Sequence, residues 1–210
     1  AAKGFMASGL HCGIRKNRSK SDLALIVSDR PCAAAGVYTQ NLVKGAPVAL
    51  TQRNLADGIA QAVICNSGIA NTCAPDGMEK AEEMGQIAAE VLGLAPSDIV
   101  VASTGVIGPS LPTGNIRAAA PDLKAALSPQ GSHAAAEAIM TTDTVAKEVA
   151  VSCEIGGHQV KIGGISKGSG MIHPNMATML CFVTSDCAIA PDLLRKAVKT
   201  AADATFNMIS

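Results

Sequence analysis

A strand–helix–strand unit between residues 61 and 102 constrains the fold more than any other part of the chain. A helix is predicted over residues 76–92, with Asp76 as its cap and Gly93 as its stop. Apolar residues recur there at i, i+3, i+4 and i+7: Met84, Ile87, Ala88 and Val91. Buried strands are predicted on either side, over residues 61–65 and 99–102. The pattern indicates an α/β protein.

The remaining segments fit the same class. Three short apolar runs are predicted as strands: residues 22–27, 33–39 and 46–50. Two alanine-rich helices are predicted near 115–127 and 132–140, with Pro121 breaking them apart, and a last helix begins at Pro191. Residues 145–155 alternate, with Val149, Val151, Cys153 and Ile155 on one face. Gly156-Gly157 then predicts a hairpin turn into a further strand.

Composition excludes several classes of function. The 210 residues carry no formal net charge and only 2% aromatic residues, which argues against nucleic-acid and membrane-surface partners. No run of 18 or more apolar residues is present, and no signal peptide is visible at the start. The seven cysteines form no CxxC pair and no Cys/His metal spacing, so we expect no metal, mostly core cysteines and a reducing, cytoplasmic location.

The stretch from Gly163 to Val183 carries the chemistry. A glycine-rich loop holds Lys167, a Pro174-Asn175 turn follows, and the pair Ala177-Thr178 opens an apolar, strand-like run. A phosphate-binding loop would need Gly-Lys-Ser/Thr at a helix start, whereas here the lysine precedes Gly168 and a strand follows. Nucleotide binding is therefore disfavoured.

A nucleophile at Thr178 is the sharper alternative. Cleavage of the Ala177–Thr178 bond would give Thr178 an α-amine beside its own hydroxyl, a known activated nucleophile. Such an amine has a pKa of about 7.7–8.0, near working pH. General-base help from it is worth roughly 10²–10⁴-fold. Spacing alone leaves open that Thr178 is an ordinary β-branched strand residue.

Polar groups at other predicted strand ends could complete such a site. Thr104-Gly105 offers a hydroxyl and a backbone N–H for an oxyanion, although a plain turn explains it equally. The run 66–71 and the basic segment 15–20 are interpreted as a turn and a solvated strand end, with ligand or carboxylate binding as the alternatives. The four histidines stand in unrelated contexts and form no Ser/His/Asp triad.

Seven runs in order along the chain together resemble the ornithine acetyltransferase family of arginine biosynthesis, the glutamate N-acetyltransferases. The runs are Gly13–Lys16, Asp22–Ile26, Val37–Asn41, Asn66–Asn71, Ser103–Gly108, Thr141–Thr144 and Lys167–Leu180. The last run is highly specific, and the others alone are weak. The resemblance implies layered sheets and helices similar to the N-terminal-nucleophile and aminopeptidase-like architecture.

The resemblance also implies a precursor that cleaves itself between Ala177 and Thr178, giving an α chain of residues 1–177 and a β chain that starts over residues 178–210. Thr178 would be the nucleophile, and Thr104 and Gly105 the oxyanion pair. Thr142, Lys167 and Thr178 match substrate-contacting positions, with Thr144 an open alternative to Thr142.

The family's reaction passes an acetyl group from N-acetylornithine through Thr178 to glutamate, without a cofactor. Some members also accept acetyl-CoA as a co-substrate. The implied assembly pairs α and β chains in a heterotetramer. An amidase or aminopeptidase with the same nucleophile, and a non-catalytic domain, are the alternatives.

Two departures from the family pattern bear on these expectations. Ile69 stands where a second Asn is expected in the 66–71 run, which puts a ligand role of that run in doubt. Family members also continue well past Ser210 and carry further substrate contacts there. A polypeptide of these residues alone is therefore expected to be incomplete as an enzyme.

Overall fold

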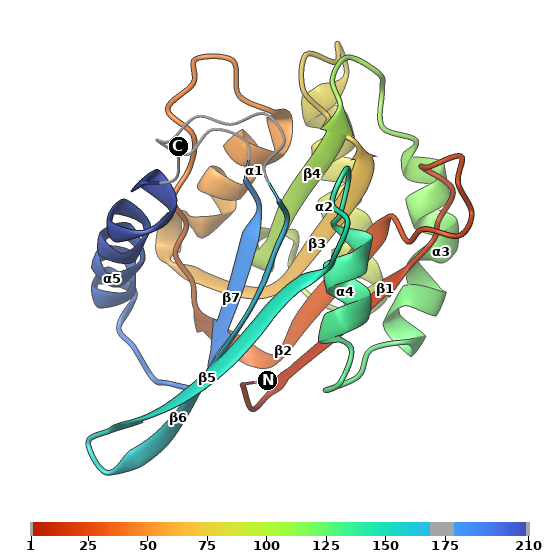
Figure 1. Cartoon of the computed structure of the whole chain (residues 1–210). Coiled ribbons are helices and arrows are strands. Elements are labelled where there is room, and N and C mark those ends of the chain that lie inside the picture. The colour runs from red at the N-terminus through yellow and green to blue at the C-terminus, as the bar shows by residue number, and fades with distance from the viewer. Residues whose placement is uncertain (1, 169–178, 209–210) are drawn as a thin grey trace.

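Two stacked β-sheets organise the chain in a computed structural model that describes residues 2–168 and 179–208. The first sheet has the order β1-β2-β3-β4, formed by β1 (Phe5–Leu10), β2 (Leu23–Ala33), β3 (Ile59–Ile69) and β4 (Ile99–Val106). Neighbouring strands are antiparallel except β3 and β4, which run parallel and are joined by the predicted helix (Figure 1). The strand–helix–strand expectation is therefore confirmed.

Three helices cover one face of this sheet: α1 (Ala46–Asn54), α2 (Gly77–Leu92) and α3 (Thr113–Ala125). Their shared core contains Leu23, Leu25 and Ile64 from the strands and Met84, Ile87 and Ile116 from the helices. Gly93 ends α2 with a φ of 73°, the left-handed stop that its position predicts. Asp76 precedes α2 but makes no side-chain cap; its carboxylate accepts the Ser110 hydroxyl at 2.5 Å instead.

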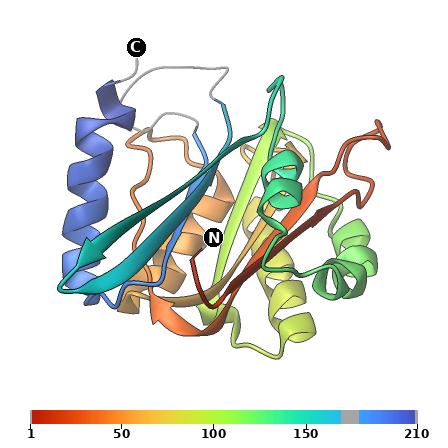
Figure 2. The same cartoon turned by 60° about the horizontal axis from the view of Figure 1, so that its bottom comes forward.

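The opposite face packs against the second sheet and a short helix, α4 (Ser132–Ala138) (Figure 2). The second sheet has the order β5-β6-β7, from β5 (Lys147–Ile155), β6 (His158–Ser166) and β7 (Cys181–Ser185). Ile26 and Cys65 of the first sheet meet Ile165 and Phe182 of the second in one core. The layers are thus helix, sheet, sheet, which confirms a layered α/β fold.

The predicted hairpin is present. Gly156 and Gly157 join β5 to β6 with φ of 58° and 79°, which only glycine adopts readily. The apolar face of β5 is exposed, however: Val149 is 67% and Val151 55% exposed. Helix α5 (Pro191–Ala204) begins at its proline as predicted. Three single-turn helices complete the described chain: η1 (Leu55–Asp57), η2 (Pro96–Asp98) and η3 (Phe206–Met208).

Two of the predicted strands are wrong. Residues 46–50 belong to α1, because Pro47 presets the first turn and Pro47, Leu50 and Thr51 are buried at helical spacing. The Thr51 hydroxyl bonds the backbone of Val101 at 2.8 and 3.0 Å, which fixes α1 on β4. Residues 34–39 form no strand, since β2 ends at Ala33 opposite Ile59, the first residue of β3.

Three further expectations need correction. Pro121 lies inside α3, on its exposed side, rather than between two helices. Residues 66–69 and 103–106 extend β3 and β4 rather than forming loops, and they pair with one another. Of the seven cysteines, all free thiols, only Cys65 is fully buried, because most of the others lie at element ends or on exposed faces.

Candidate active site

The carboxyl end of β4, which pairs with that of β3, holds the predicted oxyanion pair. Thr104 is opposite Ser67, and Gly105 is opposite Gly68. Because side chains alternate along a strand, Thr104 faces the same side as Ala102, which packs toward the second sheet. Thr104 is 7% exposed, and its hydroxyl makes no hydrogen bond to another described residue. A hydroxyl that no described residue engages is available to a ligand.

Gly105 lies where no other residue fits. Its φ is 135°, and a Cβ there would overlap the Gly68 carbonyl group and lie 2.6 Å from the nitrogen of Ile69. The two strands approach so closely at this point that Thr104 can pair with Ser67 only because Gly105 has no side chain. Glycine at this position is therefore a packing requirement as well as a candidate donor.

We expect Gly105→Ala to lower the free energy of unfolding by about 1–3 kcal/mol more than Gly108→Ala does, because overlap adds to backbone strain only at Gly105. Gly108 also has a positive φ, 106°, but its added Cβ would meet nothing within 4 Å. Both values come from denaturant unfolding of the two variants. Equal losses would show that the close approach to Gly68 is not tight.

Lys167 directly follows β6 and is buried, at 5% exposure. Its backbone N–H donates to the carbonyl of Leu180 at 2.9 Å, and its ammonium donates to the carbonyl of Gly168 at 2.8 Å. Burial lowers the pKa of Lys167, and Asp143 opposes that effect. Burial raises the pKa of Cys65 to about 12, and the charge of Lys167 acts against that rise.

The run between α4 and β5 approaches the same place. Asp143 accepts the backbone N–H of Gly168 at 2.6 Å and the Lys147 ammonium at 2.8 Å. Thr142 and Thr144 flank this inward carboxylate, and both are exposed. The structure thus brings the Thr142 segment beside Lys167.

Arg15 is a residue whose place the sequence pattern did not indicate. The basic pattern predicts a solvated segment over residues 15–20, and Lys16, Arg18 and Lys20 are indeed exposed. Arg15 instead turns inward, and its guanidinium donates to the carbonyl of Met140. Its backbone N–H donates to the buried Asp22 at 2.8 Å. No local signal marks it, because its partner lies 125 residues away.

Ala177 and Thr178 lie outside the described residues. The described residues nearest to them in sequence are Gly168 on one side and Met179 on the other. The bond between Lys167 and Leu180 brings these two sides together. Lys167 and the Thr142 segment therefore lie where the described chain stops before the predicted cleavage site and resumes after it.

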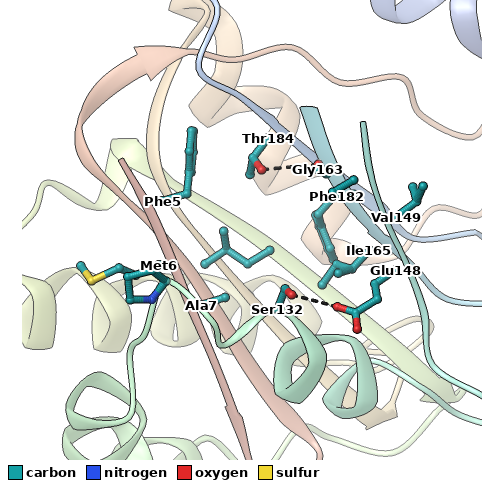
Figure 3. A pocket seen from close by; sticks show the side chains of 14 residues that line it. Phe5, Met6, Ala7, Ser132, Glu148, Val149, Gly163, Ile165, Phe182 and Thr184 are labelled. Atoms are coloured by element: carbon teal, nitrogen blue, oxygen red, sulfur yellow. Dashed lines mark hydrogen bonds between the residues drawn. The ribbon is translucent and has the colours of Figure 1, made fainter. Parts of the chain in front are cut away.

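A cavity of about 180 Å³ lies elsewhere, between the first strands and the second sheet (Figure 3). Phe5, Ile26, Ile165 and Phe182 make it mostly apolar, and Glu148 at its wall accepts the Ser132 hydroxyl at 2.8 Å. None of the predicted site residues lines it. Over residues 2–168 and 179–208, no three His, Cys, Asp or Glu side chains gather as metal ligands.

None of the helices in residues 2–168 and 179–208 combines the length and the apolar character that a membrane crossing requires.

Comparison with known proteins gives consistent matches. The ArgJ family model matches residues 6–210. The arginine biosynthesis bifunctional protein ArgJ of Symbiobacterium thermophilum is 54% identical over 212 residues, covering 100% of this chain and 53% of that protein. The chain thus spans about half the length of the curated relatives it matches.

Solved structures agree. Ornithine acetyltransferase from Mycobacterium tuberculosis, complexed with ornithine, matches with a TM-score of 0.77 and 37% identity over 86% of this chain and 94% of that one. An aminopeptidase and esterase/amidase from Ochrobactrum anthropi, a variant of the Ntn-hydrolase fold, matches with a TM-score of 0.53 and 13% identity, over 96% of this chain and 66% of that one. The second likeness concerns the fold alone, and it confirms the expected architecture.

Proposed function

Because the chain belongs to the ArgJ family, the ornithine acetyltransferases of arginine biosynthesis, we propose that it is part of an enzyme that passes an acetyl group from N-acetylornithine to glutamate through Thr178. The observation that carries the proposal is the convergence of Lys167, the Thr142 segment and the Leu180 carbonyl, which belong to or contact the described residues on either side of positions 169–178. The ornithine bound to the Mycobacterium relative supports the substrate class.

Self-cleavage comes first in this proposal. The Thr178 hydroxyl attacks the Ala177 carbonyl, and the C–N bond breaks, so the amide becomes an ester and the Thr178 amine is freed. Water then hydrolyses the ester, which releases the Ala177 carboxylate and restores the Thr178 hydroxyl. Residues 1–177 then form the α chain, and 178–210 begin the β chain. One observation supports a divided precursor: the chain covers 94% of the solved Mycobacterium chain but only 53% of the curated Symbiobacterium protein.

Acetyl transfer then needs two attacks. The Thr178 amine takes the hydroxyl proton while the oxygen attacks the acetyl carbonyl, and the Thr104 hydroxyl and Gly105 N–H bind the oxyanion. Ornithine leaves with the proton, and the amine of glutamate attacks the acetyl ester to regenerate Thr178. Lys167 holds a carboxylate of the amino-acid substrate, with the Thr142 hydroxyl beside it.

The proposal extends to the donor, the assembly and the location of the enzyme. Acetyl-CoA serves as an alternative acetyl donor. The α and β chains assemble as a heterotetramer, and the enzyme works in the cytoplasm.

A single assay tests the transfer. Full-length protein is incubated with N-acetylornithine, with and without glutamate, and ornithine and N-acetylglutamate are measured. We expect ornithine to accumulate beyond one equivalent only with glutamate. Release at the same rate without glutamate would instead support an amidase with the same nucleophile.

Cleavage is tested separately. On a denaturing gel the full-length protein is expected to run as two bands, and N-terminal sequencing of the second should read Thr-Met-Leu-Cys. An active preparation made only of intact chain would contradict the mechanism.

A further inference from the structure

We propose that Asp143 is the positioning residue of this site: its carboxylate ties the Thr142 segment to the start of the cleavage run and holds a fixed negative charge beside Lys167. The inference rests on the proposed function, where Lys167 binds substrate and Thr142 lies beside it. Asp143 itself touches no reacting atom.

The Asp143 carboxylate is buried and hydrogen-bonds two separate segments of the chain. The Asp143 side chain is 2% exposed. One oxygen accepts the Gly168 N–H at 2.6 Å and the Lys147 ammonium at 2.8 Å, and the other accepts the Thr141 N–H at 3.0 Å. A carboxylate offers about four acceptor positions, so most are already filled by protein donors. Asp143 therefore joins two segments that are 25 residues apart and leaves little room for a substrate donor.

A second contact holds the same segment from the opposite side. Arg15 donates to the carbonyl of Met140, and the Arg15 Cγ lies 3.0 Å from where a Cβ on Gly68 would stand. Thr142 is thus exposed between Met140, anchored by Arg15, and Asp143, anchored to Gly168. A threonine between two anchored neighbours has a fixed backbone, so its hydroxyl can be presented without extra ordering cost.

The charge of Asp143 acts on Lys167. Burial by itself would raise the pKa of Asp143, but the Lys147 and backbone hydrogen bonds outweigh it and lower the pKa to about 2. Asp143 is thus ionised at every working pH. Four described groups act on Lys167 besides burial: Asp143 and Cys65 raise its pKa, and Lys147 and Arg15 lower it.

The sign of the pH effect follows. Any activity that needs the Lys167 cation is complete below the pKa of Lys167 and is lost as pH rises through it. Removing the Asp143 charge removes an attraction that stabilises the Lys167 cation. The alkaline limb of the pH–activity profile should therefore move to lower pH. Removing the Lys147 charge takes away repulsion, so the limb should move to higher pH.

The decisive variant is Asp143→Asn in the full-length protein. We expect kcat/KM to fall by about 10²-fold, the loss that a misplacement of about 1 Å can cause. Its alkaline limb should move down, while Asp143→Glu should keep the limb in place and recover part of the rate. Lys147→Met changes a half-exposed side chain and should move the alkaline limb to higher pH. This variant tests the inference if Asp143→Asn does not fold.

Asp186→Asn is the matched control. Asp186 also accepts two backbone N–H groups, from Lys161 at 2.7 Å and Lys3 at 3.1 Å. Unlike Asp143, it is not among the charged groups that shift the pKa of Lys167. We expect that variant to lose stability without a change in the pH profile. The inference is overturned if Asp143→Asn and Asp186→Asn both lose only stability, or if Lys147→Met leaves the limb unmoved.

The pKa of Lys167, followed by NMR in protein with labelled lysines, gives a readout without turnover. If the wild-type protein transfers no acetyl group, the proposed function fails. The Asp143 inference then stands or falls on whether this pKa drops in Asp143→Asn.

Discussion

Full-length protein carrying Thr178→Ala is expected to remain a single uncleaved chain and to lose acetyl transfer by roughly 10⁴-fold or more, the scale seen when a covalent nucleophile is removed. In the proposed mechanism the same Thr178 oxygen attacks the Ala177 carbonyl and later carries the acetyl group, so its removal stops both steps. Gel mobility, N-terminal sequencing and the rate of N-acetylglutamate formation measure the two losses.

Thr178→Ser is the matched control, because it keeps a hydroxyl at the same position and removes only a methyl group. It should still cleave and still transfer, at a reduced rate. Transfer by Thr178→Ala at a rate near that of the wild type would mean that the acetyl group never resides on residue 178. Cleavage in Thr178→Ala would place the self-cleaving nucleophile elsewhere in the chain.

Local patterns predicted those elements whose determinants are local. The periodicity of α2 and the glycine pair between β5 and β6 each specify their structure within a few residues. The strand prediction for residues 46–50 is wrong because a run of five apolar residues fits a strand or a helix equally well. Only the burial of Leu50 and Thr51 against β4 decides between the two. Tertiary packing therefore decided where the pattern was short.

The candidate site divides in the same way. The strand-end pattern and the family resemblance predict Thr104 and Gly105, and the resemblance alone predicts Thr142 and Lys167. The structure brings the Thr142 segment beside Lys167, and the four roles stay predictions. Arg15 and Asp143 were not singled out, because their roles depend on partners 125 and 25 residues away. A buried carboxylate and an inward arginine show no periodicity, so only the fold reveals them.

Thr104→Val is expected to lower the rates of cleavage and of acetyl transfer by about 10²–10³-fold, the effect of losing one oxyanion donor. Valine replaces the hydroxyl with a methyl group at nearly constant volume. Since the Thr104 hydroxyl makes no hydrogen bond to another described residue, the substitution leaves none of those residues without a hydrogen-bond partner. The free energy of unfolding should therefore change little, and kcat should fall more than KM rises, because the oxyanion exists only in the transition state.

Ser67 supplies the comparison, because it pairs with Thr104 across β3 and β4 and carries the neighbouring hydroxyl. That hydroxyl is already committed, since it donates to the carbonyl of Ala138 at 2.6 Å. Ser67→Ala should thus cost about 1–3 kcal/mol in unfolding free energy while keeping most of kcat. Thr104→Val with kcat near that of the wild type, or a rate loss in Ser67→Ala as large as that in Thr104→Val, would remove Thr104 from the oxyanion hole. A loss of kcat in Thr104→Val together with a loss of only stability in Ser67→Ala would assign the two adjacent hydroxyls to different tasks. The Thr104 hydroxyl would act in the reaction, and the Ser67 hydroxyl would hold α4 on the sheet.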